Sequence, residues 1–499
     1  MNTSTLFKAF TGIALTSVFA LTGCQKEALM EEQFQNPAVF TDSMHGQAIP
    51  GQYIVVFKNS GSLSATGVNA LTIAGRSATI SLRERIIETA GIERSAIEQT
   101  YEGTINGFAA RLTKQQLEKL RLNSEVAYVE QDRIIALAKP TTSDNDNTQT
   151  KGGGNTKTDT TKGGGNTKTN GKDNSTSEPV PTEPTPIEEP VSETPQEPVT
   201  EQPQEPITEQ PQEPVTEQPE EPVTTQPTEP EPVVAPVTYT KITPLMGESL
   251  PWHISMNGFG DGTGKTVYII DSGVDTDHPD LNVDLLRSRS LIYGDESIED
   301  GFGHGTQVAG IIGAKNNGTG MIGVAANATI VALRVFDNTG YGTVSRAINA
   351  VNYVSNTGKS GDVVNMSLGS GVSSTLDNAV MTAASKGILF AIAAGNSATD
   401  CTMNSPARVN APGVYTVSAM DRYQYLWSSS NFGAPVDFTA PGVGITTTKI
   451  GGGLSSGATG TSFAAPHVAG ILLLRGEVFA QGTVNGDKDS WPDPIASVE

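Results

Sequence analysis

Cysteine is nearly absent from this chain of 499 residues, in which only Cys24 and Cys401 occur. Two cysteines cannot build the disulfide framework that stabilises many small secreted domains, so any fold here must rest on apolar cores. Positive charge is also scarce, with 32 Lys and Arg against 54 Asp and Glu and a net charge of −22. A nucleic-acid-binding protein concentrates positive charge, so this class of function is excluded.

Long apolar runs are missing too, apart from one near the start. Residues 9–23 are largely apolar and follow a short cationic start; this length suits a signal peptide but is too short to span a bilayer. The run ends in Leu21-Thr22-Gly23-Cys24, which resembles the lipobox of bacterial lipoproteins, whose cysteine is lipidated and becomes the new N-terminus. We predict a lipoprotein signal peptide over 1–23, a lipidated Cys24 and a tether over 24–50. The alternative is a plain secretory signal with an incidental cysteine.

The acidic charge is concentrated in one segment. Residues 178–236 hold 15 Glu, no Lys or Arg, and 17 of the 30 prolines, in repeats of the type QPQEPVTE. Such a composition cannot bury enough apolar surface to fold, and eight residues are too few for a repeat with its own core. We therefore expect a disordered linker over 139–237, rich first in Gly and Thr and then in Pro and Glu, with an extended second part. The alternative is a ligand for proline-binding domains.

Residues 51–138 carry the pattern of a small α+β domain. Apolar strands and helices alternate there in the order βαββαβ, which is typical of a ferredoxin-like fold. Thr113 followed by Gln116 predicts a capping box at the start of the second helix. No residue of this segment has a setting that suggests catalysis.

Residues 238–499 change to strands that alternate with helices. This alternation predicts a doubly wound parallel sheet with helices on both faces, so the fold class is α/β with an N-terminal α+β domain. The expected strands are 266–270, 329–335, 362–367, 388–393 and 414–419, and the expected helices are 304–314, 343–356, 374–386 and 462–478. In such sheets the chemistry lies at the carboxyl ends of the strands.

Three motifs fall at those positions. Asp271 ends an apolar strand and precedes a Ser-Gly turn, and His304 lies between two glycines at the start of an apolar helix. Ser462 lies at the start of another apolar helix, where the positive end of the helix dipole would stabilise an oxyanion. The remaining histidines are less suited to act as a base, because His45, His253 and His278 are expected at the surface and His467 inside an apolar helix.

Together the three motifs resemble the subtilisin superfamily, the proteinase K branch in particular, over roughly residues 250–475. The resemblance implies that Ser462 is the nucleophile, that His304 is the general base and that Asp271 orients the imidazole. It also implies that Asn396, in Ala393-Ala394-Gly395-Asn396, donates to the oxyanion beside the backbone N–H of Ser462. The substrate backbone would pair with the strand that contains Ser367, Leu368 and Gly369.

The same resemblance gives further residues a role. Residues 51–138 are similar to the inhibitor prodomain of these proteases, whose C-terminal tail blocks the cleft. This favours self-cleavage near Ala138, and a cut near Thr238 is the alternative. No cofactor is implied for catalysis. Pro412, Val414 and Asp437 match a structural Ca²⁺ site of two carbonyls and one carboxylate, for which a structural turn is the alternative. Cys401 lies where relatives often carry a disulfide cysteine, and we expect a free thiol because its partner is missing.

These features predict a serine endopeptidase made as a lipid-anchored, self-processing zymogen. Its substrates would be proteins or peptides, its inhibitor its own prodomain, its membrane contact the N-terminal lipid, and its oligomeric state a monomer. The precursor is expected in the bacterial cell envelope, and the mature enzyme outside the cell or in the periplasm. The rival hypothesis is a catalytically inactive envelope scaffold that binds peptides.

Overall fold

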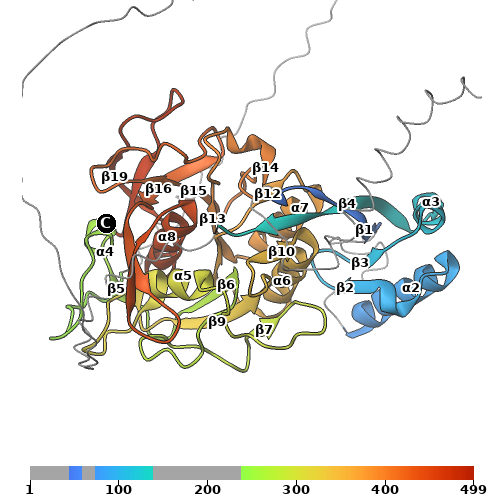
Figure 1. The fold of residues 1–499 in the computed structure, drawn as a ribbon, viewed down its shortest axis with the longest axis horizontal. Coiled ribbons are helices and arrows are strands. Elements are labelled where there is room, and N and C mark those ends of the chain that lie inside the picture. Colours follow the sequence, from blue (N-terminus) through green and yellow to red (C-terminus); the bar gives the residue numbers. More distant parts are fainter. Residues whose placement is uncertain (1–43, 59–72, 139–237) are drawn as a thin grey trace, which may run out of the picture. The chain divides into compact units, whose positions relative to one another are not determined.

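The computed structural model of this chain describes residues 44–58, 73–138 and 238–499 (Figure 1). The expected signal peptide, the lipidated Cys24, most of the tether and the expected disordered linker lie outside the described residues. Among the helices that are described, none is long and apolar enough to cross a membrane. We call residues 44–138 the first domain and residues 238–499 the second domain.

The first domain has the predicted ferredoxin-like order. Its antiparallel sheet has the strand order β4-β1-β3-β2, and its helices pack on one face of the sheet over an apolar cluster that includes Phe108 and Leu120. The capping box of Thr113 and Gln116 is confirmed. The elements are β1 Ala48–Phe57, α2 Ile73–Ala90, the 3-10 helix Arg94–Ala96, β2 Ile97–Tyr101, β3 Gly107–Arg111, α3 Lys114–Leu122 and β4 Val126–Ala136.

The second domain is built on a nine-stranded sheet of order β19-β20-β16-β15-β13-β11-β6-β9-β7. All neighbours are parallel except the pair β19–β20, so the predicted parallel sheet is confirmed. The strands are β6 Thr266–Asp271, β7 Arg289–Ser290, β9 Thr329–Arg334, β11 Val363–Met366, β13 Leu389–Ala393, β15 Val414–Met420, β16 Val436–Pro441, β19 Phe479–Thr483 and β20 Pro494–Ser497.

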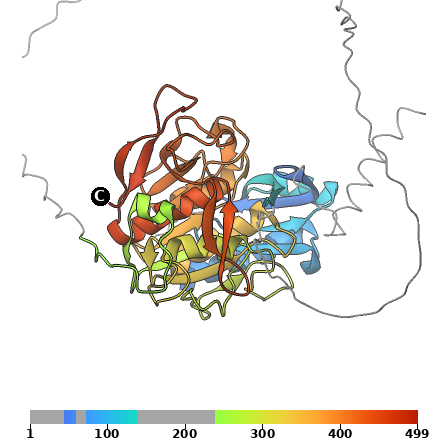
Figure 2. The same ribbon diagram turned by 60° about the vertical axis from the view of Figure 1, so that its left-hand side comes forward.

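Helices cover both faces of this sheet, as the doubly wound pattern requires. Because side chains alternate along a strand, Val267 and Ile269 of β6 enter one apolar core while Tyr268 and Ile270 enter the other. The first core is covered by α5 and α8, which lie against each other in the turned view (Figure 2). The second is covered by α6 and α7. The helices are α4 Trp252–Asn257, α5 His304–Gly313, α6 Val344–Thr357, α7 Ser374–Ala384 and α8 Thr461–Arg475.

Short elements complete the second domain. They form three two-stranded ribbons and one helical turn at the ends of the main sheet. These elements are β5 Gly260–Asp261, β8 Ala325–Ala326, β12 Ser370–Gly371, β14 Asn404–Ser405, β17 Ile445–Thr448, β18 Leu454–Ala458 and the 3-10 helix Cys401–Met403. A further short strand, β10 Tyr341–Thr343, pairs with β4 of the first domain and so extends the sheet of that domain.

Two carboxylates of the first domain meet helix N-termini of the second domain. Asp132 accepts a hydrogen bond of 3.0 Å from the backbone N–H of Ser345, in the first turn of α6. Glu130 accepts one of 3.1 Å from the backbone N–H of Thr375, in the first turn of α7. Both bonds satisfy helix N–H groups that lack partners within the helix, and negative charge is favourable there. Burial nevertheless raises the pKa of Asp132 to about 6.

Candidate active site

Asp271 and His304, far apart in the sequence, form a buried hydrogen-bonded pair. Asp271 ends β6 and His304 begins α5, and the imidazole Nδ1 lies 2.9 Å and 3.0 Å from the two carboxylate oxygens. A Cβ on Gly305 would lie 2.0 Å from the carbonyl oxygen of Gly273. Only glycine therefore lets the first turn of α5 come this close to the end of β6.

The surroundings of His304 favour its protonated form. Burial opposes charging of the imidazole, but the Asp271 carboxylate and, beyond it, Asp300 outweigh burial, so the pKa of His304 lies above its usual value. Asp300 itself accepts from the backbone N–H groups of Gly303 and Thr306 and thereby holds the start of α5. The carboxylates thus both fix the imidazole and raise its basicity.

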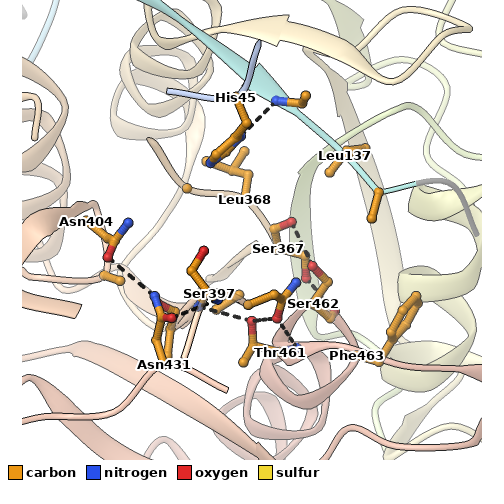
Figure 3. Close-up of a pocket in the computed structure, with 18 of the residues that line it drawn as sticks. His45, Leu137, Ser367, Leu368, Ser397, Asn404, Asn431, Thr461, Ser462 and Phe463 are labelled. Atoms are coloured by element: carbon orange, nitrogen blue, oxygen red, sulfur yellow. Dashed lines mark hydrogen bonds between the residues drawn. The ribbon is translucent and has the colours of Figure 1, made fainter. Parts of the chain in front are cut away.

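Ser462 opens into a cavity (Figure 3) that His304 also lines. The cavity has a volume of about 430 Å³ and is also lined by the predicted residues Ser367, Leu368, Gly369 and Asn396. The hydroxyl of Ser462 donates to the carbonyl of Ser367 at 3.3 Å; within the part of the chain that the structure describes, it makes no hydrogen bond with His304.

The amide of Asn396 is oriented by Thr461, a residue that the sequence analysis did not assign. Its Oδ1 accepts from the backbone N–H of Thr461 at 2.9 Å and from the Thr461 hydroxyl at 2.8 Å. Because the oxygen is held in this way, the amide nitrogen is left as the donor beside the start of α8. Thr461 was missed because a threonine at a helix start indicates no more than a cap.

Asn431 fastens the loop that carries Asn396. Its Oδ1 accepts from the backbone N–H groups of Ser397 and Thr399 at 2.9 and 3.2 Å, and its Nδ2 donates to the carbonyl of Ala394 at 2.9 Å. The side chain is fully buried and lines the cavity. A single asparagine in a loop carries no sequence signal for this contact, which forms only in the folded chain.

The end of β4 enters the cavity as an extended segment. Ala136, Leu137 and Ala138 line it, and the N–H of Leu137 donates to the carbonyl of Gly340 at 2.9 Å. The register Tyr341↔Ala136 places the segment antiparallel to β10. Sequence analysis predicted the strand with Ser367 as the backbone-pairing edge and missed β10, whose three residues are too short for a recognisable strand pattern.

The residues predicted to bind Ca²⁺ lie at the starts of two neighbouring strands of the main sheet, with Pro412 just before the first of them. Val414 begins β15 and Asp437 belongs to β16, where the Asp437 carboxylate accepts from the backbone N–H of Thr416 at 2.8 Å. Burial raises the pKa of Asp437 to about 6, and no described Lys, Arg or His forms an ion pair with it. A half-buried carboxylate without a cationic partner fits a Ca²⁺ ligand, although no cluster of three or more His, Cys, Asp or Glu side chains occurs among the described residues.

Two expectations about histidines are wrong and one about cysteine is confirmed. His253 and His278 are buried, with 0% and 3% of their surface exposed, because tertiary contacts cover them; His253 Nδ1 lies 2.8 Å from His467 Nε2. His45 is exposed, as expected, but it lines the cavity. Cys401 is a buried free thiol, and burial raises its pKa to about 12.

Comparison with known proteins gives matches to both domains. The profile of the subtilase family matches residues 262–488, and that of peptidase inhibitor I9 matches residues 52–138. "Subtilisin Savinase" of Lederbergia lenta is 40% identical over 235 residues, 46% of this chain and 84% of that protein. "Alkaline serine exoprotease A" of Vibrio alginolyticus is 28% identical over 427 residues, 86% of this chain and 60% of that protein.

Two further matches are a curated protease and a solved structure. "Alkaline protease" of Alkalihalobacillus alcalophilus is 40% identical over 237 residues, and the match covers 46% of this chain and 60% of that protein. A solved structure described as "Crystal structure of a cold adapted subtilisin-like serine proteinase" is 35% identical, with a TM-score of 0.43, over 50% of this chain and 97% of the other. The chain thus spans about 60% of the length of several curated relatives that it matches.

The contrast between His304 and the other buried histidines is measurable. In NMR spectra of the full Ser462→Ala chain with labelled histidine, His304 should titrate above pH 6.5, its usual pKa. His253 should stay neutral there, because burial lowers its pKa to about 4. Asp271→Asn should reduce the proton affinity of His304 by about tenfold or more, since it removes the adjacent charge. An unchanged titration of His304 in that variant would contradict the electrostatic assignment.

Proposed function

This chain belongs to the subtilase family, and we propose that it is a serine endopeptidase that hydrolyses protein or peptide substrates. The observation that carries the proposal is the buried Asp271–His304 pair, which faces the same cavity as Ser462 and the amide of Asn396. Nucleophile, base, orienting carboxylate and oxyanion donor therefore converge on one space. The uncharged Ala393, Ala394 and Ala407 that also line the cavity favour an uncharged substrate side chain there.

The mechanism follows from this arrangement. The Ser462 oxygen attacks the carbonyl carbon of the scissile peptide bond while His304 Nε2 takes the hydroxyl proton. Asp271 holds Nδ1–H and stabilises the imidazolium, and Asn396 and the N–H of Ser462 donate to the oxyanion of the tetrahedral intermediate. The imidazolium then gives the proton to the leaving amine, which leaves an acyl-enzyme on Ser462. Water, deprotonated by the same imidazole, hydrolyses the acyl-enzyme.

The first domain supplies the inhibitor. Its end lies antiparallel to β10 with Leu137 bonded to Gly340, and a substrate strand would pair with the same edge. Ala138 follows Leu137 in this segment and lines the cavity together with Ser462. We place the self-cleavage between Ala138 and Lys139, which leaves the linker on the second domain.

Loss of the nucleophile tests the function. Ser462→Ala should abolish peptide hydrolysis and leave the chain at full length, while Asn396→Ala should lower kcat by about 10²–10³ because one oxyanion donor is lost. The wild-type chain, made in a host without other active proteases, should give a mature form that begins at Lys139 on N-terminal sequencing. A fluorophosphonate probe should label the mature wild type only. Absence of labelling and hydrolysis in the folded wild type would favour the inactive scaffold.

A structural Ca²⁺ at Pro412, Val414 and Asp437 is part of the proposal. Two carbonyls and a carboxylate supply oxygen ligands, and the ion would neutralise Asp437 and tie β15 to β16. Since ligand binding to the native state stabilises it by about 2.7 kcal/mol at a hundred times Kd, a chelator should lower the wild-type Tm. Asp437→Asn should remove most of this chelator effect, and Glu296→Gln, an exposed carboxylate, should preserve it. Equal wild-type Tm values with and without chelator would eliminate the site.

The lipid anchor is the last part of the proposal. Cys24 precedes the first domain and Ser462 belongs to the second, so a cut after Ala138 leaves the lipid on the inhibitor and frees the protease from the membrane. After fractionation of bacterial cells, the wild-type protease domain should be soluble and the uncut Ser462→Ala chain membrane-bound. Cys24→Ser in the Ser462→Ala background should release the uncut chain. If mature, active enzyme stays on membranes after a high-salt wash, the proposal that cleavage releases the protease domain from the membrane is refuted.

A further inference from the structure

Two separate segments of this chain approach the cavity, and only one of them is the tail that was expected there. The first is the end of β4, residues 134–138, which we call the tail. The second is residues 44–47, which precede β1 and which we call the strap. His45 of the strap lines the cavity together with Ser462 (Figure 3), and His304 lines it as well. The sequence analysis had treated these residues as part of a tether.

The strap and β10 lie on opposite edges of the tail. Along an extended segment, successive N–H groups point to opposite sides. Leu137 accordingly donates to Gly340, next to β10. Ile134 and Ala136 point the other way: Ile134 donates to the carbonyl of Gln47 at 2.9 Å, and Ala136 donates to His45 Nδ1 at 3.1 Å. The tail is therefore flanked by β10 on one edge and by the strap on the other. The strap is a turn, closed by a hydrogen bond from the N–H of Gln47 to the carbonyl of Met44.

Further contacts fix the strap. The N–H of Gly46 donates to the carbonyl of Ile134 at 2.9 Å, and the Arg133 guanidinium donates to the carbonyl of Gly46 at 3.0 Å. Met44 is buried in an apolar cluster with Ile49 and Ile134, against which Ala136 and Tyr341 pack. The strap thus has an apolar anchor as well as backbone bonds to the tail.

The strap lies on the side of the tail that faces residues 367–371, which comprise the predicted substrate-pairing segment and β12. A Cβ on Gly46 would be 3.6 Å from the backbone nitrogen of Gly371. Ser367, Leu368 and Gly369 line the cavity beside His45, yet within the described ranges no backbone hydrogen bond joins residues 134–138 to residues 367–369. The N–H and carbonyl of Ile134 and the N–H of Ala136, which face away from β10, are already bonded to the strap.

We propose that the strap is a second inhibitory segment, which makes the inhibitor bipartite: the tail blocks the catalytic residues, and the strap closes the open edge of the tail. The inference rests on the proposed protease function. The strap accepts hydrogen bonds from the outward N–H groups of the tail through the carbonyl of Gln47 and the side chain of His45. After the bond following Ala138 is cut, the tail leaves only when it also separates from β10, as one unit with the strap.

The consequence is a cleaved but still inhibited stage, and His45 should lengthen it. In the full-length precursor, His45→Ala should leave cleavage after Ala138 in place but shorten the delay between cleavage and the appearance of peptidase activity by roughly two- to tenfold, the range that loss of one hydrogen bond gives. His45→Gln keeps an acceptor and should restore much of the delay. Gln115→Ala, on the exposed side of α3, is the matched control.

Mature enzymes from all these precursors have the same sequence, so their kcat and KM must agree, and any difference in delay arises in the precursor. An equal delay for wild type and His45→Ala would refute the inhibitory role of the strap and leave the proposed protease function intact. A wild type that never hydrolyses peptide would instead refute the protease function. If His45→Ala lowers the yield of folded precursor, the proposal is tested instead by hydrogen exchange of backbone amides in the uncut Ser462→Ala chain. There His45→Ala should speed exchange of Ala136 but not of Leu137, and equal rates at Ala136 would refute the strap.

Discussion

The close approach of α5 to the end of β6 is the constraint on which the candidate site depends. It places a buried imidazole against a buried carboxylate, and it is possible because Gly305 lies where any Cβ would collide with the carbonyl of Gly273. An unpaired buried charge in this position would be costly, but each group of the pair has the other as its hydrogen-bond partner. Asp300 accepts a hydrogen bond from the N–H of Gly303 at the start of α5. Ser462 and Asn396 face this pair from the start of α8 and from the loop after β13.

The sequence predicts those parts of the fold and of the candidate site that depend on local patterns, and it does not predict contacts between distant segments. Asp271, His304 and Ser462 are recognisable because each lies at the end of an element whose pattern is local, and the order of strands and helices follows from the same patterns. The ferredoxin-like domain and the parallel sheet were predictable for this reason. His253 and His278 were placed at the surface wrongly, since nothing local marks a histidine that distant elements bury.

The contacts that were missed are all made between distant segments. Thr461 and Asn431 hold the Asn396 loop from residues that follow it by many positions. The edge β10 is recognisable only from its partner β4, and His45 reaches the cavity only because residues 44–47 turn back along β4. The sequence shows which residue types are available, but the pairing of such segments emerges only when the chain is folded.

The tail, β10 and the strap also bear on how the protein avoids association with itself. Exposed strand edges are templates for pairing between molecules. In the precursor, β4 covers β10, and the strap covers the outer edge of the tail. Once the first domain departs, the second domain exposes β10, but this strand has only three residues and Gly342 at its centre. An edge so short offers a substrate a place to pair, yet gives a second copy of the enzyme too few backbone groups for stable stacking.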